Sequence, residues 1–312
     1  WLERESKPGR RIYGYTVWEL ERLPRHWPDI LNQLDGVIVP CQWNLSVFRD
    51  SGVHVPIHVV PHLSQFESMP EPSPADRDRL LGHLGDYRQS IDNRFIFYTI
   101  GFWSHRKAPY LAIEAYWKAF AHDDPVLMVV KTSNKDITCW HRSWRNGFRL
   151  RHPSPALSIE RMIRKSGGKL APVALIADEQ LSDGEMQSLH ALGNCFVSLT
   201  RTEGWGLGAF EAARLGKPVV MTAYGGQLDY LAGDRSKLID YKMIPVHEPT
   251  WASSYTPQDY WADPDVNQAA ACMRNIFDKP DAARADAAQQ ALHIEQKFSQ
   301  DSIVRLLLEI LN

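Results

Sequence analysis

The sequence predicts an α/β protein with doubly wound parallel sheets, and three observations support this fold class. Short apolar runs alternate with amphipathic stretches along most of the chain, as expected for parallel strands joined by helices. The length of 312 residues corresponds to about two domains at roughly 100–200 residues each. Glycines also cluster directly after one buried apolar run, Cys195–Thr200, where such folds bring a loop close to a ligand.

Residues 1–63 form a first block with three predicted strands. These are Ile12–Trp18, Gly36–Pro40 and Val55–Val60, and the predicted helices are Trp27–Leu34 and Asn44–Ser51. Three strands are too few to cover both faces of an independent sheet of this type. We therefore expect residues 1–63 to be the remaining C-terminal part of a first, acceptor-side Rossmann-like domain whose opening strands are missing from this sequence.

Residues 64–94 break the alternation and are predicted to be a linker with an insertion. Three prolines, Pro70, Pro72 and Pro74, precede a charged stretch with helical potential. Near the other end of the chain, residues 299–312 are predicted to form a separate helix. Its apolar stripe consists of Ile303, Leu306, Leu307, Ile310 and Leu311.

Residues 95–298 form a second predicted Rossmann-like domain. Its expected strands are Phe95–Ile100, Val126–Val130, Val173–Ala177, Cys195–Thr200 and Pro218–Ala223. Its expected helices are Leu111–Ala121, Ile159–Ser166, Asp183–Leu192, Gly208–Leu215, Gln227–Leu231, 265–278 and 281–297. Residues 247–264 are rich in proline and aromatic residues and are predicted to be a loop.

The segment Ser198–Ala223 carries the most informative functional pattern. Glu203 precedes its glycine-rich loop, and Glu211 lies one turn into the helix that follows. A helix start offers unpaired N–H groups that can accept a diphosphate, whereas carboxylates can accept sugar or ribose hydroxyls. This combination suits a nucleotide-sugar. Both acids could instead be structural groups that stabilise the helix start.

The same segment resembles the retaining glycosyltransferases of family 4. The resemblance rests on the spacing Glu203-x7-Glu211, with Gly204, Gly206-Leu207 and Ala212 inside or beside it, and on Gly216-x-Pro218-Val219-Val220. Weaker matches follow the family's order over nearly all of the chain: Trp18-Glu19-x4-Pro24-x2-Trp27, Asp35-x-Val37-x-Val39-Pro40, Val59-Val60-Pro61-His62, Gly101 through Arg106-Lys107, and Gly225-Gly226 with Asp229. The resemblance implies the GT-B fold, in which two Rossmann-like domains face a cleft and the last helix, here 299–312, crosses back to the first domain.

The resemblance also implies roles for four residues. Glu211 would hold the ribose hydroxyls of the donor, and Glu203 would lie near the transferred sugar and the reaction centre. Lys107, with Arg106 beside it, would pair with the donor diphosphate and stabilise the leaving group. Arg106-Lys107 could also be an ordinary solvated pair.

Relatives often have an arginine where this chain has Phe102, so Arg106 or Lys131 is expected to supply the missing charge. The other donor-side residues expected from the resemblance are Gly101, Asp178, Gly206, Leu207 and Gly208. Those expected on the acceptor or sugar side are Glu19, Gly225 and Gly226.

The implied reaction is transfer of a hexose from a UDP- or GDP-linked donor to a glycan or a lipid-linked acceptor. The family retains the anomeric configuration without an assigned carboxylate nucleophile, and the departing phosphate helps to deprotonate the acceptor. The chain contains no D-x-D motif, so we expect no catalytic metal.

Charge and cysteine content limit the possible partners and locations. The chain holds 35 basic and 37 acidic residues, a net charge of −2, which gives no overall field to attract nucleic acid. The four cysteines lie far apart without ligand spacing, so we expect neither zinc nor disulfides and a cytoplasmic location. No run approaches 18 apolar residues, so no membrane span is predicted.

One segment, residues 142–169, is locally basic, with interleaved aromatic residues and one acid. Such a segment can touch an anionic membrane at the inner face, grip an anionic acceptor, or simply be a solvated surface. The sequence leaves these three possibilities open.

Two alternatives to the transferase also remain. A nucleotide-sugar epimerase shares the fold and would convert its sugar with no acceptor present. A non-catalytic glycan- or nucleotide-binding subunit is suggested by the incomplete first block and by Phe102, although the presence of both glutamates argues against it. Tyr255, Tyr260 and Trp261 could stack on a sugar ring or pack inside the protein.

Overall fold

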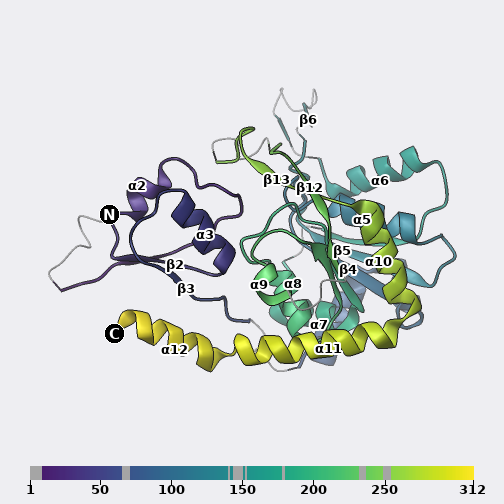
Figure 1. Ribbon diagram of the computed structural model, residues 1–312. Coiled ribbons are helices and arrows are strands. Elements are labelled where there is room, and N and C mark those ends of the chain that lie inside the picture. Colours follow the sequence, from purple (N-terminus) through teal and green to yellow (C-terminus); the bar gives the residue numbers. More distant parts are fainter. Residues whose placement is uncertain are drawn as a thin grey trace.

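The computed structural model describes residues 9–64, 71–139, 141–142, 150–151, 153–177, 180–231, 237–248 and 254–312. Two parallel sheets form the frame of this part of the chain. Figure 1 shows the smaller sheet, in purple, beside the larger one, with the last two helices running beneath both.

The first block contains a three-stranded parallel sheet in the order β1-β2-β3. Its elements are β1 (Tyr13–Tyr15), α2 (Trp27–Leu31), β2 (Gly36–Val39), α3 (Gln42–Asp50) and β3 (Ile57–Val59). All three predicted strands and both predicted helices are confirmed. The central strand β2 is buried along its whole length, because α3 packs its Val47 and Phe48 against this sheet.

The second block contains a six-stranded parallel sheet in the order β11-β10-β9-β4-β5-β8. The strands are β4 (Phe95–Ile100), β5 (Val126–Thr132), β8 (Val173–Ala177), β9 (Cys195–Ser198), β10 (Val219–Thr222) and β11 (Leu238–Ile239). The five predicted strands are confirmed, and the two-residue β11 was not predicted. The chain builds the sheet outward from β4 to β8 and then returns to place β9 on the other side of β4. The strand order therefore reverses between β4 and β9, which is where open α/β sheets bind ligands.

Helices cover both faces of the larger sheet. On one face, α5 (Pro109–Ala119) and α10 (Val266–Asp278) pack against Val126, Met128 and Val130 of β5. On the other face of the sheet, Leu127 and Val129 of β5 share a second core with residues of α7 (Asp183–Leu192), α8 (Leu207–Arg214) and α11 (Pro280–Lys297). Alternate apolar side chains of β5 thus pack into the two cores on opposite faces of the sheet.

The predicted linker contributes to this second layer. It forms α4 (Pro74–His83), which begins with a capping box between Ser73 and Asp76, and the 3₁₀ segment η1 (Gly85–Asn93). α4 packs against α7, and the buried residues Leu80, Leu81, Leu84 and Ile91 share the core of the larger sheet. Part of this insertion is therefore a structural component of the second block.

The predicted loop 247–264 is wrong at its C-terminal end. Residues Tyr260–Pro264 form β13, which pairs antiparallel with β12 (Tyr241–Pro245). The high aromatic content reflects packing, because Trp261 is 1% exposed and Tyr255 is 9% exposed in one core with Trp18 of the first block. This β12–β13 hairpin, with the residues it carries, covers one side of the small first block.

The C-terminal helix α12 (Gln300–Leu311) runs to the first block (Figure 1). The hydroxyl of Tyr13 donates to the carbonyl oxygen of Ile310 at 3.2 Å, and the Arg11 guanidinium donates to that of Leu311. Within the predicted stripe Ile303 is buried, Leu307 and Ile310 are half-buried against the core, and Leu306 and Leu311 are exposed.

The chain therefore passes between the blocks twice, and the two passages meet at one ring. The ring centroid of Trp205 lies 6.0 Å from that of His62, on the outgoing passage, and 5.5 Å from that of Phe298, on the return.

The remaining elements are α6 (Pro155–Ser166), α9 (Leu228–Leu231) and the short antiparallel pair β6 (His141–Arg142) and β7 (Leu150–Arg151). None of the helices in the described ranges combines the length and apolar character that crossing a membrane requires.

Candidate active site

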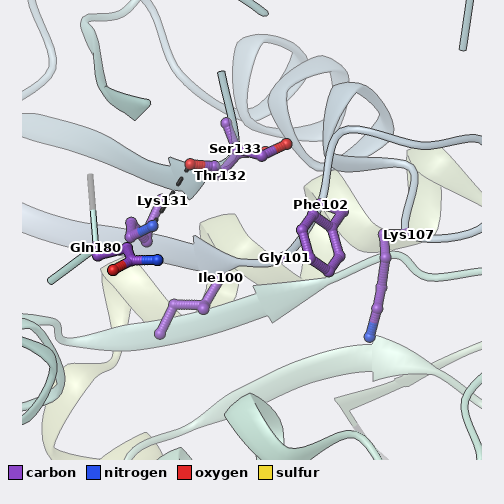
Figure 2. A pocket seen from close by; sticks show the side chains of 8 residues that line it. All are labelled: Ile100, Gly101, Phe102, Lys107, Lys131, Thr132, Ser133 and Gln180. Atoms are coloured by element: carbon purple, nitrogen blue, oxygen red, sulfur yellow. Dashed lines mark hydrogen bonds between the residues drawn. The ribbon is translucent and has the colours of Figure 1, made fainter. Parts of the chain in front are cut away.

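A cavity of about 510 Å³ opens at the carboxyl ends of β4 and β5, beside the reversal of strand order. This volume lies within the roughly 300–1,000 Å³ typical of small-molecule sites. Three predicted donor-side residues, Gly101, Lys107 and Lys131, line it together with Phe102 (Figure 2). The residues that the sequence did not predict are Ile100, Thr132, Ser133 and Gln180.

Apolar surface makes up most of the cavity wall, and lysine, serine and glutamine side chains add polar groups to it. Phe102 is 60% exposed at the lip, whereas Thr132 is 3% exposed at the end of β5. The Thr132 hydroxyl is buried and has no hydrogen-bond partner among the described residues. An unmade hydrogen bond in such a buried place costs about 1–3 kcal/mol.

The basic turn that follows Gly101 brings two cations onto Glu203. Lys107 Nζ lies 2.5 Å from Glu203 Oε1, and Arg106 Nη1 lies 3.4 Å from Glu203 Oε2. These three side chains come from the loops after β4 and β9, the two strands that flank the reversal of strand order. The structure therefore brings Arg106, Lys107 and Glu203 into one cluster.

The mutual charges decide the protonation of this group. The pKa of the Glu203 carboxyl is lowered: burial acts to raise it, but the charges of Lys107 and Arg106 outweigh burial. The pKa of Lys107 is lowered, mainly by burial, against the opposing effect of Glu203. Burial also acts to lower the pKa of Arg106, yet Glu203 and Glu19 raise it overall. The carboxylate therefore stays ionised well below neutral pH.

Glu19 extends the cluster across the boundary between the blocks. Its Oε1 lies 3.4 Å from Arg106 Nη2, and its Oε2 accepts a hydrogen bond from the Tyr255 hydroxyl at 3.0 Å. Thr202 adds a contact by donating to the Glu19 carbonyl. Glu19 is thus an ion-pair partner that faces the second block. The role of Tyr255, which packs on Trp18, was not predicted, since a tyrosine 236 positions along the chain leaves no local signal.

Glu211 lies on the buried side of α8 and is 4% exposed. Its Oε2 accepts a hydrogen bond from the Ser64 hydroxyl at 2.5 Å. α8 begins at Leu207, one residue before the expected start, after Gly206 at φ 85°, a conformation that favours glycine. Gly208 lies against β9, where an added Cβ would come 3.2 Å from the Phe196 ring.

The Gly225-Gly226 turn lies directly beneath Glu203. Gly226 N–H donates to the Glu203 carbonyl at 2.8 Å, and Gly225 has φ 113°. A Cβ at Gly226 would meet the Gly204 carbonyl oxygen at 2.0 Å. Close backbone packing under Glu203 therefore accounts for both glycines in this structure.

Asp178 and Asp229 are two further residues that the sequence analysis named. Asp178 lies outside the described residues. Asp229 accepts a hydrogen bond from the backbone N–H of Gln42 at 2.9 Å and so joins the two blocks. In the described ranges no three His, Cys, Asp or Glu side chains come together as a metal site.

Comparison with solved structures identifies the fold. HepE from Anabaena, in complex with UDP and glucose, superposes with a TM-score of 0.67 at 15% identity, over 97% of this chain and 71% of HepE. WaaG, a glycosyltransferase involved in lipopolysaccharide biosynthesis, gives 0.57 at 16% identity over 86% of this chain and 59% of WaaG. Sucrose-phosphate synthase from Thermosynechococcus elongatus gives 0.60 at 18% identity over 91% of this chain and 59% of the synthase.

These similarities show that the chain has the GT-B fold, which confirms the predicted fold class. No protein-family model matches the chain, and no curated protein matches it. At such low identity the structural likeness establishes the fold, and the activity has to be argued from the site.

Proposed function

We propose that this protein is a retaining glycosyltransferase that moves a hexose from a nucleoside-diphosphate sugar to a glycan or lipid-linked acceptor. The carrying observation is the Arg106–Lys107–Glu203 cluster beside a 510 Å³ cavity at the reversal of strand order. The comparisons support this choice, because HepE was solved with UDP-glucose and TarM with UDP, fondaparinux and α-GlcNAc-glycerol. This chain spans 50% of that TarM chain.

In the proposed complex the diphosphate lies between Lys107 and Lys131, which both line the cavity. Lys107 then exchanges part of its contact with Glu203 for a phosphate oxygen, and Arg106 remains with Glu203 and Glu19. The positive charge stabilises the leaving diphosphate in a partly dry site. Glu211 binds the ribose hydroxyls in place of Ser64, and the donor lies near the start of α8.

The proposed chemistry needs no carboxylate nucleophile. Both oxygens of Glu203 already face cations, and its lowered pKa keeps it ionised, so it orients the sugar and the turn. The bond from the anomeric carbon to the phosphate oxygen breaks, and the electron pair leaves with the diphosphate. The acceptor oxygen bonds to the same face of that carbon, while its proton passes to the departing phosphate oxygen. Because Lys107 and Lys131 carry the charge that compensates the diphosphate, we propose that the reaction is independent of metal.

The proposal also covers the acceptor side and the location. Glu19, which pairs with Arg106, borders the acceptor side, as do Gly225 and Gly226, which lie against the Glu203 backbone. In the basic segment 142–169, α6 exposes Leu157 and Ile163 beside Arg164 and Lys165, which supports a peripheral contact with an anionic surface. The four cysteines are free thiols, in keeping with a cytoplasmic location.

The first test is a thermal-shift panel of UDP, GDP, ADP and the matching nucleotide-sugars, with EDTA present. A ligand at about 100 times its Kd stabilises the folded protein by roughly 2.7 kcal/mol, which raises Tm by several degrees. A shift with one base identifies the donor class. No shift with any nucleotide, from a protein that melts cooperatively, would overturn the proposal.

A second assay separates the activities. Conversion of the matching nucleotide-sugar to its epimer without an acceptor would favour the epimerase, whereas nucleotide binding with no turnover on glycan or lipid acceptors would favour a binding subunit. Transfer of labelled hexose in EDTA, with the anomeric configuration retained, supports the transferase.

A further inference from the structure

Arg201 is a buried cation that the proposed chemistry does not use. It follows β9 and precedes Glu203 by two positions, yet its side chain points to the β12–β13 hairpin and is absent from the cavity lining. Nε and Nη2 donate to Asp263 Oδ1 at 3.1 and 2.8 Å. The guanidinium also lies 5.8 Å from the ring centroid of Tyr110 and 5.5 Å from that of Trp261.

The remaining edge of this guanidinium holds the basic turn. Nη1 donates to the carbonyl oxygen of His105 at 2.6 Å and to the Tyr110 hydroxyl at 2.7 Å. The Arg201 backbone N–H donates to the Arg106 carbonyl at 2.8 Å, and the Thr200 hydroxyl donates to that same carbonyl at 3.1 Å. The peptide groups directly before Lys107 are therefore fixed from the β9 side.

The turn needs such support because its backbone is strained. Ala108, the residue after Lys107, has φ 42°, a left-handed conformation that an alanine rarely adopts. Positions of this kind persist only where the surroundings hold them. The guanidinium, with its planar set of donors, can bind Asp263 and the His105 carbonyl at once, which a lysine ammonium cannot reproduce.

We propose that Arg201, held by Asp263, is a positioning residue that sets the Arg106–Lys107 turn for the donor diphosphate. The inference rests on the proposed function, and it adds a residue that acts through the turn without touching the donor. It also explains a link between the hairpin and the site: Asp263 lies on β13, and the Ala262 N–H donates to the Arg201 carbonyl at 3.0 Å. The hairpin is thereby connected to the turn that carries the cations.

The test compares Arg201→Lys, Arg201→Met and Asp263→Asn with the parent protein. Binding is measured by calorimetry for whichever of UDP, GDP and ADP the parent binds most tightly, and separately for the corresponding nucleoside. We expect the diphosphate to bind roughly 10- to 100-fold more weakly, the loss that misplacing a group by about 1 Å produces, with the nucleoside nearly unaffected. Arg201→Lys should retain more affinity than Arg201→Met, because it keeps the charge.

Arg274→Lys is the matched control. Arg274 also pairs with an aspartate, Asp124, and also lies over aromatic rings, those of Phe120 and Phe277, but it is remote from the cavity. It should lower Tm without changing either affinity. Arg201 and Asp263 variants that lose stability like this control and bind the diphosphate like the parent would overturn the positioning role alone. A folded parent that binds no nucleoside diphosphate would instead overturn the proposed function, and this inference with it.

Discussion

Glu19 and Arg106 pair across the boundary between the two blocks, with 3.4 Å between Oε1 and Nη2. The pair is mostly buried, with the side chains 21% and 14% exposed, and Tyr255 holds the second oxygen of Glu19. A residue of the first block is thereby in direct contact with the turn that carries Lys107.

Replacing Glu19 by Gln should affect turnover more than donor binding. Arg106 keeps Glu203 and the Thr202 carbonyl, so we expect a loss of only about 1–2 kcal/mol in stability. Turnover should fall roughly tenfold, because the blocks no longer hold the turn in one place. Steady-state kinetics with Glu21→Gln as the neighbouring control checks this, and equal effects of both variants would argue against the contact.

Replacing Lys107 by Met should weaken diphosphate recognition selectively. Loss of one charge-assisted hydrogen bond, about 1.5–3 kcal/mol, corresponds to a roughly 10- to 100-fold weaker Kd for the nucleoside diphosphate. The nucleoside should bind as before. Lys118→Met, at an exposed position of α5, is the control, and calorimetry with both ligands gives the answer.

Replacing Glu211 by Ala should weaken the nucleoside and the diphosphate alike, since the proposed contact is with the ribose. Ser64→Ala removes the hydroxyl group that donates a hydrogen bond to Glu211, but it leaves the Glu211 carboxylate in place. We therefore expect Ser64→Ala to bind both ligands at least as well as the parent. If Glu211→Ala spared the nucleoside, the ribose assignment would be wrong.

Replacing Gly225 by Ala tests the close packing under Glu203. An added Cβ would lie 2.5 Å from the Glu203 carbonyl oxygen, and φ is 113°. Gly52→Ala is a matched control, because Gly52 has φ 99° and nothing within 4 Å of the new Cβ. Urea unfolding should show a loss of about 1–2 kcal/mol for the control and roughly 3 kcal/mol or more for Gly225→Ala.

His190 should make stability depend on pH. Burial, and to a smaller extent the charge of Lys217, lowers its pKa from 6.5 to about 4. Between these values the unfolded chain binds a proton that the folded protein does not, so stability rises with pH up to 6.5 and then levels. From pH 7.5 to 5 this group should remove about 2 kcal/mol of stability.

Urea unfolding at both pH values compares His190→Gln with His54→Gln, an exposed histidine. The first variant should lose this part of the pH dependence and the second should keep it. An unchanged slope in His190→Gln would mean that His190 is not its source.

The periodic part of the fold could be predicted from the sequence because its signals are local. Residues that are neighbours in the sequence determine the apolar runs of β4, β5 and β9. They also determine the caps of the helices between these strands. The β12–β13 hairpin was missed because its stability comes from Trp261 packing on a distant core, and a segment rich in aromatics and proline resembles a loop when taken alone.

The candidate site divides in the same way. Glu203, Glu211 and Lys107 could be selected because they lie at recognisable spacings around glycines. Ser64 and Asp263 could not, since each meets its partner only after the chain has folded across at least 62 positions. Tyr255 was noted as an aromatic residue, but its hydrogen bond to Glu19 could not be predicted for the same reason. Thr132 was found in the cavity lining only in the structure.

The two passages of the chain between the blocks meet at Trp205, against His62 and Phe298. A body joined to another at two neighbouring points turns most easily about the line through them, because rotation about that line stretches neither connection while sliding strains both. This line runs beneath the loop of Glu203. Rotation about it separates Glu19 from Arg106, and the β12–β13 hairpin from the first block, before it disturbs the contacts of Trp205. Opening of the blocks and release of the basic turn would therefore occur together.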